Sequence, residues 1–303
     1  MKKQDENQFL ETAQKVSFVS ITANVLLAIG KLIAGILASS GAMLSDAVHS
    51  FSDVFSTIVV LIGLAFSSKS ADDDHPYGHE RLECVTAILL SVVLLLSGLM
   101  IGYSGLQLIL SGDYKEKTLP GALALAAAAV SILVKEGMYH YTAHFARKIK
   151  SGSLMADAWH HRSDALSSVG AFIGIFFARM GYPIMDPLAS VIICLFIIKA
   201  AYDIFKDAMD QMVDKACPDS FTSQIRDLVL ADPDVKAIDL LQTRMFANKI
   251  YIDLEIQVDG SLPLEEAHAI AQRVHDSVEG AFSDVKHIMI HLNPVMSSDM
   301  ECA

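Results

Sequence analysis

Six stretches of the chain are apolar over the length that a helix needs to cross a bilayer. They run over residues 14–38, 42–67, 84–110, 119–142, 157–180 and 184–207, and a spanning helix takes about 20 residues. Glycine, serine, proline or charged residues separate them, as turns require. The pattern predicts six transmembrane helices over residues 14–210, preceded by a polar cytosolic tail at residues 1–13.

A different pattern begins near residue 214. Residues 249–258 alternate apolar and polar positions, as in a strand with one buried face. Helical patterns at 220–230 and 264–282 and strand patterns at 235–243 and 285–292 surround it. The order αββαβ predicts a small cytosolic α+β domain at residues 214–295, followed by a tail at residues 296–303.

Composition and charge agree with a multi-pass membrane protein. The chain is 52% hydrophobic and only 19% charged. Lysine and arginine gather on one predicted side of the membrane, which the positive-inside rule assigns to the cytoplasm together with both termini. That side would hold Lys2, Lys3, Lys15, Lys69, Arg81, Arg147, Lys148, Lys150, Lys206 and Lys215, against Lys115, Lys117 and Arg179 on the other.

The net charge of -12 argues against nucleic acid as a partner, because an acidic surface repels phosphate. The four cysteines stand singly, without the CxxC spacing of a cysteine-built zinc site.

The second and fifth predicted spans share the pattern D-A-x-H-x-x-S-D. Offsets of 0, 3 and 7 place its polar side chains on one face of a helix. Charged groups inside a bilayer cost on the order of 2.5–3.5 kcal/mol each, so two such helices should face each other or a wet cavity. Two imidazoles and two carboxylates suit a tetrahedral zinc ion. The pattern comprises Asp46, His49 and Asp53 in one span and Asp157, His160 and Asp164 in the other.

His49, Asp53, His160 and Asp164 are the candidate ligands of a transported ion. Asp46 and Asp157 lie one turn before the histidines, and we expect them to orient the imidazoles; a polar helix-packing role is the alternative. Lys31 and Arg162 are the cations that we expect nearby.

Two further groups are candidate metal sites in the cytosolic parts. Asp72, His75 and His79 lie in the loop between the second and third spans, with the spacing H-x3-H beside a run of carboxylates. Asp253, His268 and His291 lie in the tail domain, where solvated surface histidines are the alternative interpretation. His79-Glu80 lacks the second histidine of a zinc-protease motif, and no other hydrolase motif appears, so we predict a transporter and not an enzyme.

These motifs together resemble the cation diffusion facilitator family over nearly the whole chain. The resemblance rests on Asn24 and Lys31, on residues 45–53, 75–83 and 156–164, and on the final His291-Leu292-Asn293-Pro294. It implies a homodimeric, proton-coupled metal exporter with a metallochaperone-like cytosolic domain. It also implies a charge pair between Arg81 and Asp214 that steadies the dimer.

The tail-domain site departs from the family pattern. Ile238 and Asp253 stand where relatives have histidine, and Asn293 stands where they have aspartate.

The resulting hypothesis is export of zinc, with cobalt or cadmium tolerated, from the cytosol across a bacterial inner membrane in exchange for protons. Zinc would be substrate and regulatory ligand, because imidazole ligands favour it over manganese or magnesium. Three alternatives remain: iron or manganese efflux by the same mechanism, a metal sensor without flux, and an exporter of organic cations.

Overall fold

The computed structural model describes residues 2–37, 41–112, 122–180, 182, 184–246 and 249–295. The chain folds as two compact units, residues 3–209 and residues from 210 onward. Each unit has its own hydrophobic core.

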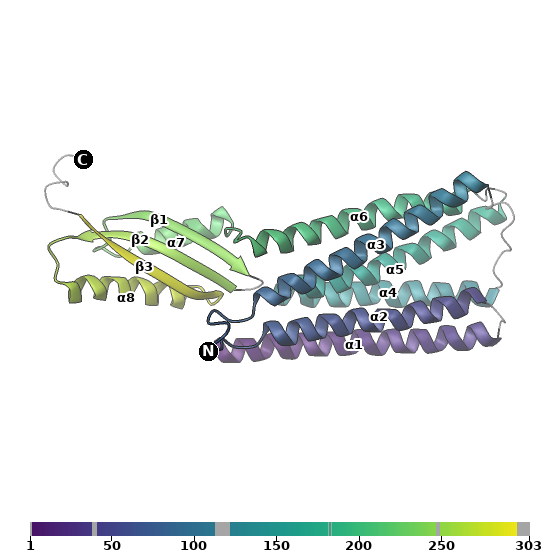
Figure 1. Ribbon diagram of the computed structural model, residues 1–303, viewed down its shortest axis with the longest axis horizontal. Helices are drawn as coiled ribbons and strands as arrows, with labels where there is room; N and C mark the ends of the chain where they lie inside the picture. Colours follow the sequence, from purple (N-terminus) through teal and green to yellow (C-terminus); the bar gives the residue numbers. More distant parts are fainter. Residues whose placement is uncertain are drawn as a thin grey trace. The chain divides into compact units, whose positions relative to one another are not determined.

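The first unit is a bundle of long helices (Figure 1). They are α1 (Lys2–Leu37), α2 (Gly41–Ser67), α3 (Arg81–Ser111), α4 (Ala122–Ile149), α5 (Gly152–Arg179) and α6 (Met185–Met212). The helix α1 begins well before the first predicted span, because the polar residues 2–13 continue it. An ion pair one helical turn apart, Glu11 to Lys15 at 2.7 Å, supports that stretch.

Within the described residues, two segments are long and apolar enough on their own to cross a membrane. They are Phe9–Ala34 and Arg81–Ser111, and Asp53–Ser67 is a shorter apolar stretch. The helices α4 and α5 carry polar side chains that the bundle buries. Lys135, Asp157, His161 and Ser163 all have less than a tenth of their surface exposed. These side chains lie inside the bundle, where other protein groups rather than lipid surround them.

Glycines let neighbouring helices of the bundle approach closely. A Cβ added at Gly63 in α2 would lie 2.1 Å from Oγ1 of Thr86 in α3, and one added at Gly102 in α3 would lie 2.5 Å from the sulfur of Cys194 in α6. Small residues at helix crossings are typical of membrane bundles, where packing replaces the hydrophobic effect as the force that joins helices.

A left-handed residue joins α4 to α5. Lys150 has φ 55°, and the backbone N–H of Ser151 donates to the carbonyl of Ala146 at 2.9 Å. The turn reverses the chain, so α4 and α5 run antiparallel and pack against each other near the turn (Figure 1). This hairpin brings Lys135 of α4 level with the polar stretch of α5.

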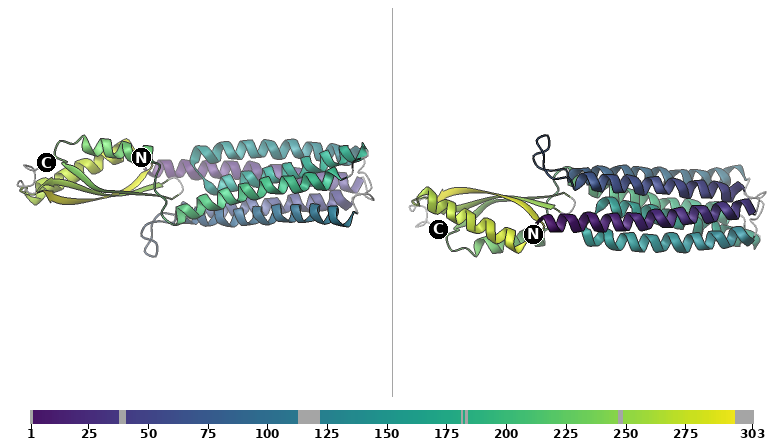
Figure 2. Two further views of the ribbon diagram at one scale, coloured as in Figure 1. Left: turned by 90° about the horizontal axis from the view of Figure 1, so that it is seen from above. Right: turned by 90° about the horizontal axis from the view of Figure 1, so that it is seen from below.

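The second unit consists of α7 (Asp219–Leu230), β1 (Ala237–Phe246), β2 (Lys249–Asp259), α8 (Leu264–Ala281) and β3 (Val285–Val295). The strand order is β1-β2-β3; β2 is antiparallel to β1 and parallel to β3. Both helices cover one face of the sheet (Figure 2), and their apolar residues pack against alternate residues of β2, from Ile250 to Val258. The predicted αββαβ order is confirmed. The opposite face of the sheet carries the polar residues of β2 and β3.

Candidate metal centre

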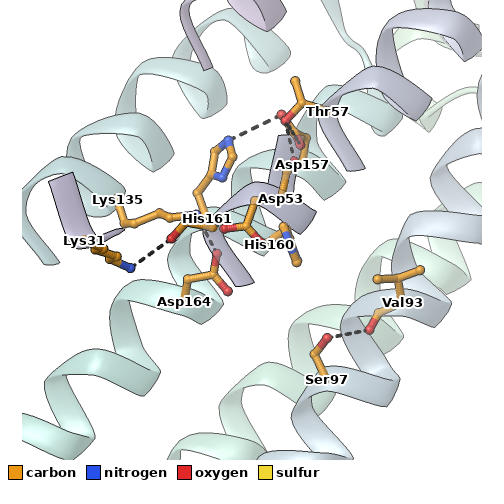
Figure 3. Close-up of polar contacts among 11 residues, drawn as sticks. Lys31, Asp53, Thr57, Val93, Ser97, Lys135, Asp157, His160, His161 and Asp164 are labelled. Carbon is orange, nitrogen blue, oxygen red and sulfur yellow. Dashed lines mark hydrogen bonds and ion pairs between the residues drawn. The ribbon is translucent and has the colours of Figure 1, made fainter. Parts of the chain in front are cut away.

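Three side chains from the duplicated motif meet inside the helix bundle. Asp53 comes from α2, and His160 and Asp164 come from consecutive turns of α5. One ligand atom from each lies within 4.8 Å of the other two, and Nε2 of His160 is 3.3 Å from Oδ1 of Asp53 (Figure 3). Asp53 is 2% exposed and His160 is 7% exposed. Two carboxylates and one imidazole at this separation can close around one divalent cation with bonds of about 2.0–2.2 Å after a small adjustment.

A fourth side chain, Lys135 of α4, lies in the same cluster and was missed by the sequence analysis. Its Nζ is 2.5 Å from Oδ2 of Asp53 and 2.8 Å from Oδ2 of Asp164, and the residue is 2% exposed. The available signal was the adjacent ionisable pair Lys135-Glu136 within a largely apolar predicted span. It was overlooked because it lies outside the repeated motif.

The cations that the sequence analysis expected lie in other contacts. Nζ of Lys31 donates to Oγ of Ser50 at 2.9 Å. Arg162 stacks over the ring of Tyr139, with its guanidinium carbon 4.3 Å from the ring centroid. Its Nη2 lies 3.8 Å from Oε1 of Glu136.

Asp157 was expected to orient the imidazole of His160, but the structure places it beside His161 instead. Nε2 of His161 is 3.5 Å from Oδ2 of Asp157, and Oγ1 of Thr57 donates to Oδ1 of Asp157 at 3.2 Å (Figure 3). Residues four apart are neighbours along one side of a helix, so Asp157 and His161 lie on the same side of α5. Thr57 lies one turn after Asp53 in α2, so this contact also joins α2 to α5.

The remaining residues of the motif, Asp46 and His49, belong to α2, and their side chains lie outside the part of the chain that the structure describes. Their predicted roles stay predictions.

The loop group is also brought together. Oδ1 of Asp72 is 3.4 Å from Nδ1 of His75, and Oδ2 of Asp72 is 3.6 Å from Nε2 of His79. The two imidazole rings lie 4.5 Å apart. A hydrogen bond from Lys69 and another from the backbone N–H of His75 hold the pKa of the Asp72 carboxyl well below its usual range, so this ligand is ionised at neutral pH.

Comparison with known proteins decides the family. The profile described as "Cation efflux transmembrane domain" matches residues 17–213, and the profile described as "Cation efflux protein, cytoplasmic domain" matches residues 217–295. The chain belongs to the cation diffusion facilitator family. This cation efflux protein is therefore a membrane protein that moves divalent metal cations, with a helical transmembrane region followed by a cytoplasmic domain.

Several relatives match over nearly their full length. The cation efflux protein is 32% identical to the uncharacterized transporter MJ0449 of Methanocaldococcus jannaschii, over 94% of this chain and 100% of that one. It is 33% identical to the uncharacterized transporter YdbO of Bacillus subtilis, over 96% and 98%. It is 28% identical to the manganese efflux system protein MneP of Bacillus subtilis, over 94% and 97%.

The predicted tail-domain ligands of the cation efflux protein do not come together within one chain. Asp253 alternates with the buried residues of β2, so it points to the face of the sheet away from α8, whereas His268 is exposed on α8 itself. His291 shares the face of Asp253, but the strand register places it beside Glu255. The alternation of β2 fixes the face of Asp253, and the position of α8 on the other face separates it from His268.

The two residues of the predicted dimer charge pair lie at the ends of helices. Arg81 is the first residue of α3. Asp214 follows α6 and has φ 64°. Their pairing stays a prediction.

Proposed function

We propose that this protein exports zinc from the cytosol in exchange for protons, with His49, Asp53, His160 and Asp164 as the transport site. The observation that carries the proposal is the buried convergence of Asp53, His160 and Asp164 from two helices, with ligand atoms within 4.8 Å of one another. A carboxylate–imidazole set matches the preferences of zinc, whereas manganese and magnesium prefer oxygen alone.

Proton exchange follows from the chemistry of the ligands. Zinc binds neutral imidazole and ionised carboxylate, so protons that occupy these groups must leave when the metal enters. If the site opens to the cytosol and to the other side in turn, an inward proton gradient re-protonates the ligands and releases the metal outside. The site then works as an antiporter without any covalent chemistry.

The remaining parts have supporting roles in this proposal. The chain begins with a cytosolic tail at residues 1–13, followed by the transmembrane domain at residues 14–210. The cytosolic domain at residues 214–295 and a terminal tail at residues 296–303 complete it, and both termini face the cytoplasm. The protein acts as a homodimer, with Arg81 and Asp214 as its stabilising charge pair. Asp72, His75 and His79 bind cytosolic metal as a regulatory site, supported by their proximity in the loop.

The test is zinc flux into proteoliposomes under an imposed pH gradient. The double variant His49→Ala, Asp53→Ala should lose flux. The matched control is His140→Ala, Asp203→Ala, whose side chains are 70% and 56% exposed and which should transport like wild type. Wild-type flux in the His49→Ala, Asp53→Ala variant would defeat the proposal. If the wild-type protein itself shows no flux, the sensor alternative is favoured.

Manganese is the second candidate substrate. The match to the manganese efflux system protein MneP over 97% of that protein favours it. Competition decides between the metals. If zinc is the substrate, a small excess of unlabelled zinc should abolish the uptake of labelled zinc. The same excess of manganese should leave that uptake in place.

A further inference from the structure

Lys135 places a positive charge at the centre of the proposed transport site. Its ammonium donates to Asp53 at 2.5 Å and to Asp164 at 2.8 Å. Both carboxylates belong to the proposed ligand set and lie close to Lys135 in Figure 3. The oxygen that each offers to Lys135 is its Oδ2. The lysine therefore binds both carboxylates as a small cation would.

The charge of the site favours one such cation at a time. Asp53, Asp164 and Lys135 together carry a charge of -1 when the imidazole is neutral. With a divalent ion added, the net charge of these groups becomes +1. If the ammonium moves away, the ion and the two carboxylates together have a net charge of 0. Net charge in a buried site within a bilayer is costly, and two cations held by the same oxygens repel each other.

We propose that Lys135 is a tethered counter-cation that competes with the metal for Asp53 and Asp164 and returns to them when the metal leaves. Metal entry pushes the ammonium off the carboxylates, and its return helps to expel the metal. The four-carbon stem of lysine permits this movement while the helix stays in place. The exchange requires no change in the protonation of Lys135. It requires only that the ammonium and the metal do not share the two carboxylates.

This inference rests on the proposed function, because it assumes that Asp53 and Asp164 bind the transported ion. It makes Lys135 a residue that sets affinity and release, and not a ligand. A lysine that merely held the helices together would stabilise the bundle, and removing it would weaken metal binding or leave it unchanged. A competing lysine predicts the opposite, since its removal should tighten metal binding.

The experiment is a calorimetric titration of the purified full-length protein in detergent with zinc. Proteoliposome flux is measured in parallel. Lys135→Met should bind zinc about tenfold or more tightly, the order of effect that groups next to metal ligands exert. Its flux should saturate at lower zinc and reach a lower maximum because release is slower. Lys135→Arg keeps the charge and should bind zinc no more tightly than wild type. The matched control Lys199→Met removes a lysine that is 73% exposed on α6, and it should leave both measurements unchanged.

Lys135→Gln is a second neutral variant, for use if Lys135→Met does not fold. Its amide can still donate a hydrogen bond to the carboxylates, which methionine cannot do. Tighter zinc binding by Lys135→Met or, if that variant does not fold, by Lys135→Gln supports the competition. Unchanged or weaker binding by the folded neutral variant overturns it and leaves the proposed function standing. Zinc binding that survives Asp53→Asn unchanged overturns both, because the metal then does not use the carboxylates that Lys135 contacts.

Discussion

Substituting Gly63 by alanine tests the close contact that positions α2 against α3. The added Cβ would lie 2.1, 2.7 and 2.8 Å from Oγ1, Cγ2 and Cβ of Thr86. Rotating the threonine does not remove the overlap, because its Cβ is fixed by the backbone, and Oγ1 also donates to the carbonyl of Leu82 at 2.9 Å. The two helices must therefore move apart by several tenths of an ångström. Overpacking of this kind costs about 1–3 kcal/mol.

The assay is thermal unfolding of the purified protein in detergent, where each kcal/mol corresponds to a fall of roughly 2–4 °C in Tm for a domain of this size. Gly137→Ala is the matched control, since a Cβ there has no atom within 4 Å. It should be neutral or stabilise by up to about 1 kcal/mol through the helix propensity of alanine. Adding Thr86→Gly to Gly63→Ala should recover part of the loss, as expected for coupled neighbours. An equal Tm for Gly63→Ala and Gly137→Ala would refute the reasoning.

Three further predictions concern other contacts. Replacing Glu83, which is 2% exposed and accepts hydrogen bonds from the first turn of α5, by leucine should lower Tm through a loss of about 1–3 kcal/mol, whereas glutamine should keep most of the stability. In a fragment of residues 210–303, Arg273→Ala should slightly lower the stability measured by urea unfolding at pH 7, because the ion pair is exposed. Arg273 lowers the pKa of Asp232 from its ordinary 3.8, so this stabilisation is present above about pH 4 and lost as the pH falls through the lowered value; a difference that does not shrink as the pH falls below about 4 contradicts the assignment. Thr57→Val removes the donor to Asp157 that joins α2 to α5 and should lower Tm through a loss of about 1–3 kcal/mol, because a buried carboxylate loses a hydrogen bond; an unchanged Tm contradicts a stabilising role for that contact.

The sequence predicted the fold well because the pattern of apolar and polar residues is regular in both units. Long apolar stretches marked the six helices, and strict alternation in residues 249–258 marked β2 and its buried face. It also predicted three side chains that meet in the candidate metal centre, because the same spacing occurs in α2 and α5 and each copy places its polar residues on one side of a helix. A repeated polar face in an apolar helix has few stable arrangements other than facing its copy.

Only the tertiary structure decided which residues complete each cluster. Lys135 lies on a helix without the motif, and its place between Asp53 and Asp164 depends on how α4 packs against α5 through the turn at Lys150. In the tail domain, α8 covers the sheet face opposite Asp253, so His268 is kept away from it. Spacing along the chain determines which side chains share one face of one helix or strand. The rotation and neighbours of that element depend on packing between distant segments, and no local pattern records them.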